Sequence, residues 1–255
     1  MDSIVLTNSN AGTNYNHKLV LKLINPMRLE NCWVCVSDIS LYYSWPNIKS
    51  EYKNNTFQYR KHIRDREYKE YNIVLPDGSY DVKDINNYLH FIMEQNGDKK
   101  DDTGKYPIEI YANNVYQRVS IVTKNKYLLT LPTNGIGKML GYTVLSDYTS
   151  VYSIDPGMER NGNEIPQIER VESVSVHCNL VNNSYDLDNN LIYSFTPDKQ
   201  FGQLLNIKPH FPVWRNTRSN AIVQDIQVWF TDQDNNPLDI QDPKIRVELQ
   251  IKDVE

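Results

Sequence analysis

Short runs in which apolar and polar residues alternate are the most frequent pattern along this chain. Between 245 and 251 every odd-numbered residue is apolar and every even-numbered residue is charged or an amide. The segments 226–230 and 174–180 show the same alternation, and 19–24 is apolar on nearly every position. A period of two indicates a β-strand with one buried face, and a continuous apolar run indicates a strand buried on both faces.

Weaker strand patterns fill much of the remaining chain. They are short, rich in Val, Ile and Tyr, and bounded by turn-forming residues. They lie at 33–43, 56–59, 71–75, 108–111, 115–123, 127–131 and 191–195. Many short strands separated by turns are typical of antiparallel sandwiches and barrels. The fold class predicted is therefore all-β.

One segment has the period of a helix instead. Apolar residues recur at spacings of three and four between Ile85 and Met93. Asp81 is a favourable N-cap, and Asp84 stands at the third helical position, as in a capping box. We predict one amphipathic helix over 82–95 that flanks the sheets. A shorter helical turn is expected at 136–140.

The chain of 255 residues shows no internal repeat and no linker of low complexity. Its length fits one all-β domain or two smaller units, and 40% hydrophobic residues can form a substantial core. Because no boundary is evident, we predict a single domain over 1–255. Two segments lack clear periodicity and are expected to be long surface loops, one near 60–70 with mixed charges and one near 146–167 with several Pro and Gly residues.

Charge and targeting signals limit the classes of partner and the compartments that the sequence predicts. The formal net charge is −5, without the basic surface that a dedicated nucleic-acid binder needs. Basic residues in 60–70 alternate with acidic ones, which favours a solvated loop or hairpin tip over phosphate binding. No signal peptide and no membrane-spanning apolar stretch is expected. Three cysteines, an odd number, favour reduced thiols and synthesis in a cytosol.

Two motifs resemble metal or redox sites only in part. Cys32 and Cys35 have C-x-x-C spacing but lie in a strand-like run without a second ligand pair, so we interpret them as structural. Asp232, Asp234 and Asn236 resemble the start of a calcium loop, but proline occupies the positions that require Gly and Glu. A polar turn between strands is the preferred interpretation.

No catalytic constellation stands out. The five histidines have neither H-x-H nor H-x-x-x-H spacing, which disfavours a metal-dependent jelly-roll enzyme. His177 alternates outward on its strand and is expected to be solvated. Phosphate-binding loops and nucleophile motifs are also missing from the sequence. We therefore predict a non-enzymatic protein with no cofactor and no metal.

Aromatic residues are more numerous than a small core requires. Five of them are candidate interface residues, because aromatic side chains anchor many protein interfaces. They are Tyr42, Tyr43, Trp45, Trp214 and Trp229.

Several stretches, in order along the chain, resemble one family of small capsid proteins. They are LYYSWPNI (41–48), NNTFQY (54–59), LPDGSYDVKDINNYLHFIMEQNG (75–97), VSVHCNLVNNSY (174–185), LIYSFTP (191–197) and DQDNNPLDIQDPKIRVELQIK (232–252). The family occurs in Polinton (Maverick) elements, polinton-like viruses and virophage relatives, and as copies integrated in eukaryotic genomes. The resemblance covers most of the chain from Leu41 onward.

The resemblance implies a single jelly-roll β-sandwich that serves as a penton, a minor capsid protein of the vertex. It implies self-assembly as a homopentamer beside a double-jelly-roll major capsid protein, location in the virion, and no catalytic residues. Three alternatives stay open: a receptor- or carbohydrate-binding jelly roll that uses exposed Trp and Tyr, a host-domesticated copy with a new role, and, least favoured, a metal-dependent enzyme.

Overall fold

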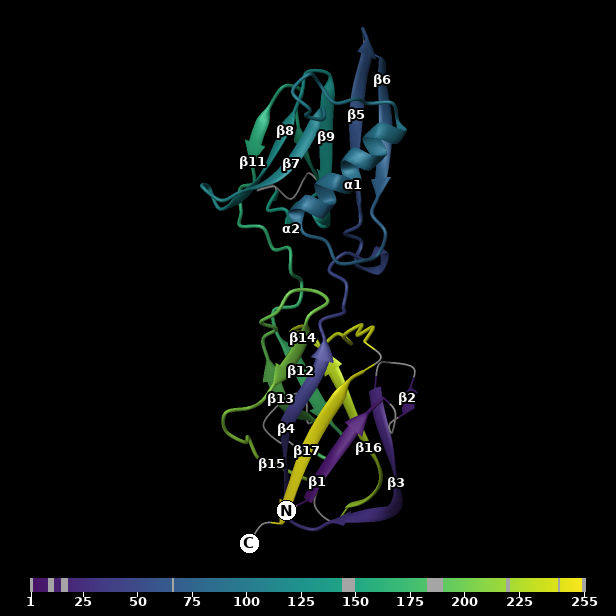
Figure 1. Ribbon diagram of the computed structural model, residues 1–255, viewed down its shortest axis with the longest axis vertical. Coiled ribbons are helices and arrows are strands. Elements are labelled where there is room, and N and C mark those ends of the chain that lie inside the picture. Colours follow the sequence, from purple (N-terminus) through teal and green to yellow (C-terminus); the bar gives the residue numbers. More distant parts are fainter. Residues whose placement is uncertain are drawn as a thin grey trace. The chain divides into compact units, whose positions relative to one another are not determined.

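The computed structural model describes residues 2–8, 12–14, 18–65, 67–143, 150–182, 190–218, 221–242 and 244–253. The chain forms two compact units, one from Met1–Trp45 with Val171–Glu255 and the other from Pro46–Arg170. In Figure 1 the purple N-terminal and yellow C-terminal strands belong to the first unit, and the teal middle of the chain forms the second. Sequence analysis expected a single domain, and this division corrects it.

Two antiparallel sheets make up the first unit. The β4 sheet contains β1 (Asp2–Thr7), β17 (Arg246–Asp253), β4 (Cys32–Tyr42) and β14 (Leu204–Ile207) in that order, and β15 (Arg215–Asn216) also pairs with β4. The β16 sheet contains β13 (Leu191–Phe195), β12 (Val174–Cys178), β16 (Ala221–Thr231), β3 (Lys18–Leu29) and β2 (Gly12–Asn14).

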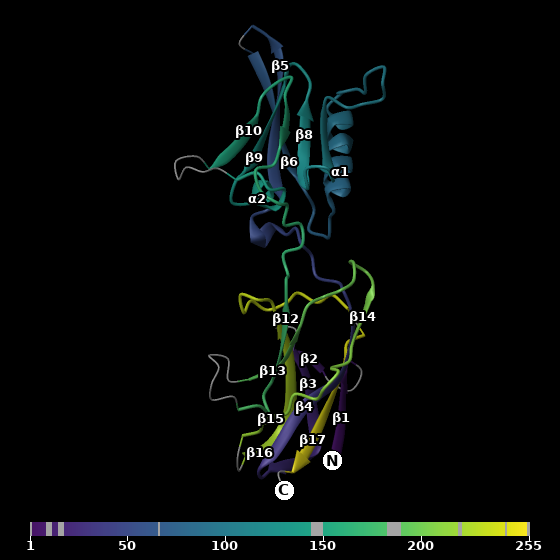
Figure 2. The ribbon, with the colours of Figure 1, turned by 90° about the vertical axis from the view of Figure 1, so that its left-hand side faces the viewer.

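These strands wind as a jelly roll. Leaving out β2 and β15, and counting the other eight strands in chain order, the β4 sheet reads 1-8-3-6 and the β16 sheet reads 5-4-7-2. This order is that of two interlocked Greek keys. Figure 2 shows the strands of this unit from a second side. The predicted all-β jelly roll is confirmed for this part of the chain, hereafter the jelly-roll unit.

The core of the jelly-roll unit lies between its two sheets. Val247 and Leu249 of β17 are fully buried, and Val228 and Phe230 of β16 contribute buried side chains to the same cluster. These residues are the apolar positions of the alternating runs, whose polar neighbours face outward on both sheets. The strongest sequence patterns therefore correspond to this sandwich.

The second unit, hereafter the inserted unit, lies between β4 and β12 in sequence and has its own core. Its β5 sheet contains β10 (Val151–Ile154), β9 (Tyr127–Pro132), β5 (Thr56–Arg64) and β6 (Glu67–Val74). Its β8 sheet contains β11 (Glu159–Asn161), β8 (Arg118–Thr123) and β7 (Ile108–Asn113). The helices α1 (Val82–Gln95) and α2 (Ile136–Met139) and the 3₁₀ turn η1 (Ser50–Tyr52) complete it.

Helix α1 has the predicted limits and the predicted capping box. The Asp84 backbone N–H donates to Asp81 Oδ1 at 2.7 Å, and the Asp81 N–H donates to Asp84 Oδ2 at 3.0 Å. Its buried stripe packs into the core of the inserted unit, where the helix flanks β7 as the predicted flanking helix does. From its polar face, Asn86 Oδ1 accepts the Ile110 N–H of β7 at 2.7 Å. This contact covers part of a sheet edge that would otherwise be open.

Both predicted surface loops contain strands. Residues 60–65 and 67–70 belong to the β5–β6 hairpin, where ion pairs join Arg60 to Glu70 and Arg64 to Glu67. Residues 146–149 lie outside the described part of the chain, and 150–167 contains the short strands β10 and β11. The N–H of Gly162 donates to the Val119 carbonyl at 2.8 Å, which attaches this segment to the β8 sheet. The first segment is therefore the hairpin that was predicted as the alternative to a solvated loop, whereas the second is a loop outside β10 and β11.

Candidate assembly surfaces

Two of the five aromatic candidates are core residues. Tyr43 and Trp45 follow the end of β4, and both are buried in the cluster between the jelly-roll sheets. Their ring centroids are 4.2 Å apart at an interplanar angle of 31°. Because their side chains are enclosed within the unit, they do not offer surface to another molecule, and their inclusion among the interface candidates is corrected.

Trp214 lies on the outer face of the β4 sheet in a group that sequence analysis did not identify. Lys252 of β17 places its Nζ 4.3 Å from the Trp214 ring centroid and 5.8 Å from that of Trp33. Trp33 and Lys252 are direct neighbours in the β4–β17 register. A lysine over two indole rings is a cation–π arrangement that keeps both rings at the surface. Alternation along β4, where Trp33 stands between buried Cys32 and Val34, was the signal available for Trp33.

Trp229 lies on the outer face of the β16 sheet. Its ring stacks on His177 with centroids 5.3 Å apart, and Lys18 Nζ lies 4.5 Å from its centroid. His177 Nε2 also hydrogen-bonds to Thr231 Oγ1 at 2.9 Å. His177 is only 2% exposed, so the expectation of a solvated histidine is wrong. A register irregularity after Val176 and the covering indole explain the difference.

Tyr42 belongs to an apolar patch at the edge of the β4 sheet. It pairs with Leu204 of β14, and the two side chains are 40% and 45% exposed. Phe201, just before β14, is also exposed and makes an edge contact with Tyr43. Tyr42, Leu204 and Phe201 are named the edge patch below. Exposed apolar side chains on an edge strand and beside it are typical of an interaction surface.

A charged network lies on the same outer face. Arg246 of β17 forms ion pairs with Asp38 of β4 and with Glu248. The hydroxyl of Ser3 donates to Glu248 at 2.8 Å. Hydrogen bonds from Ser3 and Arg246 hold the pKa of Glu248 below its ordinary value. Because these acidic and basic groups pair with one another, their charges largely cancel. The network therefore produces no electrostatic field of a single sign.

The three cysteines are buried free thiols. Burial raises the pKa of the Cys32 and Cys35 thiols, and it raises that of Cys178 to about 12. A thiol with a raised pKa is a poor nucleophile and a poor metal ligand, because the thiolate is the reactive form. Their surroundings agree with the structural interpretation of the C-x-x-C motif.

The calcium-like segment forms a turn closed by its own side chains. Asp232 Oδ1 accepts the backbone N–H groups of Asp234 at 3.0 Å and of Asn236 at 2.9 Å. The carboxylate thus stabilises the turn. Among the described residues, no group of three or more His, Cys, Asp or Glu side chains could hold a metal ion.

Across the same residues, no helix has both the length and the apolar character to cross a membrane.

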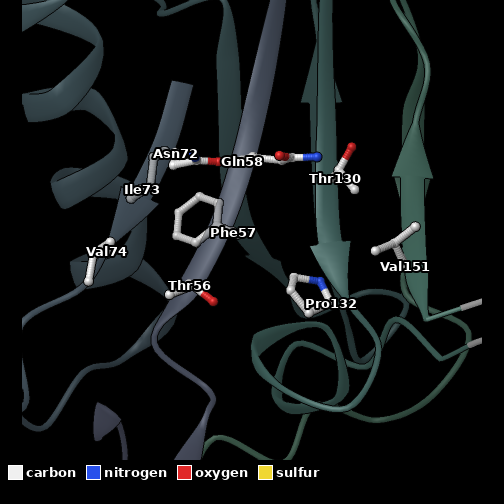
Figure 3. A pocket seen from close by; sticks show the side chains of 9 residues that line it. All are labelled: Thr56, Phe57, Gln58, Asn72, Ile73, Val74, Thr130, Pro132 and Val151. Atoms are coloured by element: carbon white, nitrogen blue, oxygen red, sulfur yellow. The ribbon is translucent and has the colours of Figure 1, made fainter. Parts of the chain in front are cut away.

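A shallow groove of about 450 Å³ lies on the inserted unit, on the face of the β5 sheet turned away from its core (Figure 3). Asn72, Gln58 and Thr130 form its floor at one level of three neighbouring strands. Val74 and Val151 line its two sides. Gln58, Asn72 and Thr130 lie in strands that the sequence predicted, but the sequence pattern does not show that these strands pair side by side.

The fold and these surfaces define a class: a jelly-roll protein with a β-rich unit inserted between the third and fourth strands of the roll. No protein-family model matches the chain, and no curated protein sequence matches it. Among 23 solved chains that match, the mavirus penton protein has a TM-score of 0.51 and 12% sequence identity, and the alignment covers 98% of each chain. At this identity the likeness shows that the two proteins share a fold.

Proposed function

We propose that this chain is a structural, non-enzymatic capsid protein that occupies the vertices of a virion. The observation that carries the proposal is the likeness to the mavirus penton protein over 98% of both chains, which includes the inserted unit as well as the jelly roll. The family resemblance of the sequence supports the same role independently of the fold. Synthesis in a host cytoplasm is consistent with three buried, unpaired thiols.

The protein assembles as a homopentamer beside a double-jelly-roll major capsid protein. In a five-fold ring, one surface of each copy meets a different surface of the next, and the rotation must close. The candidates for these two surfaces are the exposed edge patch, with Tyr42, and the half-buried outer-face indoles of Trp214 and Trp229. Each interface is expected to bury at least about 1,000 Å², the lower limit for a specific contact.

The oligomeric state of the purified chain tests this proposal. Native mass spectrometry and electron microscopy should show five-fold rings. Leu204→Asp adds a charge to the edge patch on an exposed side chain and is expected to dissociate the ring without unfolding the jelly roll. Val115→Asp, an 87% exposed apolar position in the β7–β8 turn of the inserted unit, belongs to neither candidate surface; it is the matched control and should leave the ring intact. A wild-type protein that is monomeric under all salt and pH conditions, or a trimer, would contradict the vertex assignment.

A further inference from the structure

We propose that the groove on the β5 sheet of the inserted unit binds a neutral glycan. Nine residues line it, and none is charged. Its volume of about 450 Å³ falls within the range of small-ligand sites, about 300 to 1,000 Å³. This inference concerns a different unit from the assembly surfaces of the jelly roll and does not depend on the proposed pentamer.

The strand register divides the groove into two rows. In the polar row, Asn72 stands opposite Gln58, and Gln58 stands opposite Thr130. In the apolar row, Val74 stands opposite Thr56, and Pro132 opposite Val151. Figure 3 shows the polar row at one level of the sheet, with the Asn72 amide directed toward Gln58 and the Gln58 amide toward Thr130.

The polar row has hydrogen-bonding capacity that the protein itself does not use. Within the described part of the chain, the side chains of Asn72, Gln58 and Thr130 form no hydrogen bond; Asn72 is exposed, Gln58 is half-buried and Thr130 is 6% exposed at the floor. Each amide both donates and accepts, and so does the threonine hydroxyl. Sugar hydroxyls also both donate and accept. Neighbouring hydroxyls of one sugar could therefore hydrogen-bond to the polar row whichever of its groups donate and whichever accept.

The apolar row fits the other side of a sugar. A pyranose ring has a hydroxyl-bearing edge and faces made of C–H groups, and an N-acetyl group adds a methyl. Val74, which is 56% exposed, and Val151 offer aliphatic contact for these C–H groups. The exposed area of the groove is therefore matched by a ligand that is amphipathic and uncharged.

Charge selects the ligand class. The next outward-facing residues on β5 and β6 are Arg60 and Glu70, which form an ion pair with each other. No net charge therefore adjoins the polar row. An acidic sugar would lose part of its hydration without gaining a cationic partner, so neutral glycans are favoured over sialylated or sulfated ones.

The groove has no exposed aromatic ring for stacking, because Phe57 faces the core. A single copy should therefore bind weakly, with a dissociation constant on the order of 1 mM, since a few uncharged hydrogen bonds contribute little each. Several copies on one particle would raise the apparent affinity by multivalency. The experiment must accordingly detect weak binding by a single copy.

The full-length protein is probed on an array of neutral and acidic glycans, and then by protein-observed NMR titration with galactose, N-acetylglucosamine and their disaccharides. Neutral glycans should bind and shift the Gln58 and Asn72 side-chain amide signals. Gln58→Ala with Asn72→Ala should weaken binding at least about tenfold, which corresponds to the loss of one or two hydrogen bonds. Gln250→Ala, an outward-facing amide on β17, is the matched control and should bind like the wild type.

Val74→Glu gives a second, independent test. It places a carboxylate on the exposed side of the groove, where the side chain does not contribute to the core. The variant should lose neutral-glycan binding and keep the melting temperature of the wild type. The proposal is overturned if no neutral glycan binds at millimolar concentration, if acidic glycans bind equally well, or if the double variant binds like the wild type. It is also overturned if Val74→Glu changes the oligomeric state and not glycan binding, since the groove would then be a contact between copies.

Discussion

The jelly-roll unit and the inserted unit are both β-rich, but they are stabilised in different ways. The jelly roll joins strands that are far apart in sequence, such as β1 with β17, around an apolar core between two sheets. The inserted unit joins strands that are closer in sequence and adds a helix and a buried polar network. The first arrangement buries the inner faces of two sheets against each other, whereas the second leaves one face of the β5 sheet open at the groove. Separate cores also mean that each unit can lose stability by itself.

The polar network of the inserted unit centres on Asp98, whose side chain is fully enclosed. Its carboxylate accepts hydrogen bonds from the hydroxyls of Tyr59 and Tyr127, each at 2.8 Å, and pairs with Lys61 at 2.5 Å. Asp98 follows α1, and the other three residues lie on β5 and β9. Hydrogen bonding and pairing with Asp98 raise the pKa of Lys61. The network therefore attaches the end of the helix to the sheet.

The largest expected effect is that of Phe230→Ala in the jelly roll. Phe230 is among the largest fully buried side chains and pairs with Val176 across the β16 sheet. Truncation should cost about 3–5 kcal/mol of unfolding free energy through lost burial and a cavity. Calorimetry should show the transition of the jelly-roll unit at lower temperature and that of the inserted unit unchanged. One merged transition that shifts as a whole would show that the two units are a single cooperative body.

The reciprocal change is Leu89→Ala on α1. Leu89 is fully buried in the core of the inserted unit. We expect a loss of about 2–5 kcal/mol confined to the inserted unit. Exposed Phe91 on the same helix provides the control, because Phe91→Ala removes a large side chain without opening a cavity and should change stability little. An equal effect of both substitutions would mean that α1 does not pack as described.

Asp98→Asn tests the polar network and should cost about 2 kcal/mol. The amide cannot accept from Lys61 as the carboxylate does, and hydrogen bonds to charged groups contribute about 1.5–3 kcal/mol. Glu67→Gln is the matched control, since its ion pair with Arg64 is exposed and is worth about 0–1 kcal/mol. Urea denaturation of both variants gives the comparison. If they cost the same, the buried network does not attach α1 to the sheet in the way its contacts indicate.

Sequence patterns predicted the jelly roll better than the inserted unit. Alternation located β12, β16 and β17, because one face of each strand is buried and the other is solvated. The limits of α1 were also predicted, since its capping box is local. The division into two units was missed because both are β-rich and no linker of distinctive composition separates them. The surplus of predicted strands over the eight that a jelly roll needs, concentrated within 56–131, was the available signal.

The candidate surfaces depended on contacts that sequence patterns do not contain. Trp45 lies beyond the regular part of β4, so alternation could not indicate that its ring would pack on Tyr43 in the core. His177 was expected outside, but the Trp229 ring covers it. The groove needed the pairing of three strands, β6, β5 and β9, to align its polar row, and such register is a tertiary property.

The smallest expected effect concerns alkaline pH and Cys178 of the jelly roll. Burial favours the neutral thiol and raises its pKa from 9.0 to about 12. Between these values the folded state keeps a proton that the unfolded state has lost. The stabilisation is therefore complete below about pH 9 and falls by at most about 1.4 kcal/mol per pH unit above it. Buried tyrosines of the inserted unit, such as Tyr142, have raised pKa values for the same reason, so the wild-type profile alone does not isolate the thiol.

Cys178→Ala isolates this contribution. The substitution removes one titrating group from the jelly roll, and any packing cost it adds is independent of pH. Urea denaturation in the presence of a reductant, at about pH 8 and about pH 10, should show that the jelly-roll unit of the wild type loses up to about 1.4 kcal/mol more than that of the variant. The inserted unit should lose the same amount in both proteins. Parallel pH profiles for the two jelly rolls would mean that the thiol is hydrated in the folded state, and that the apolar core is less closed around β12 than the jelly-roll frame requires.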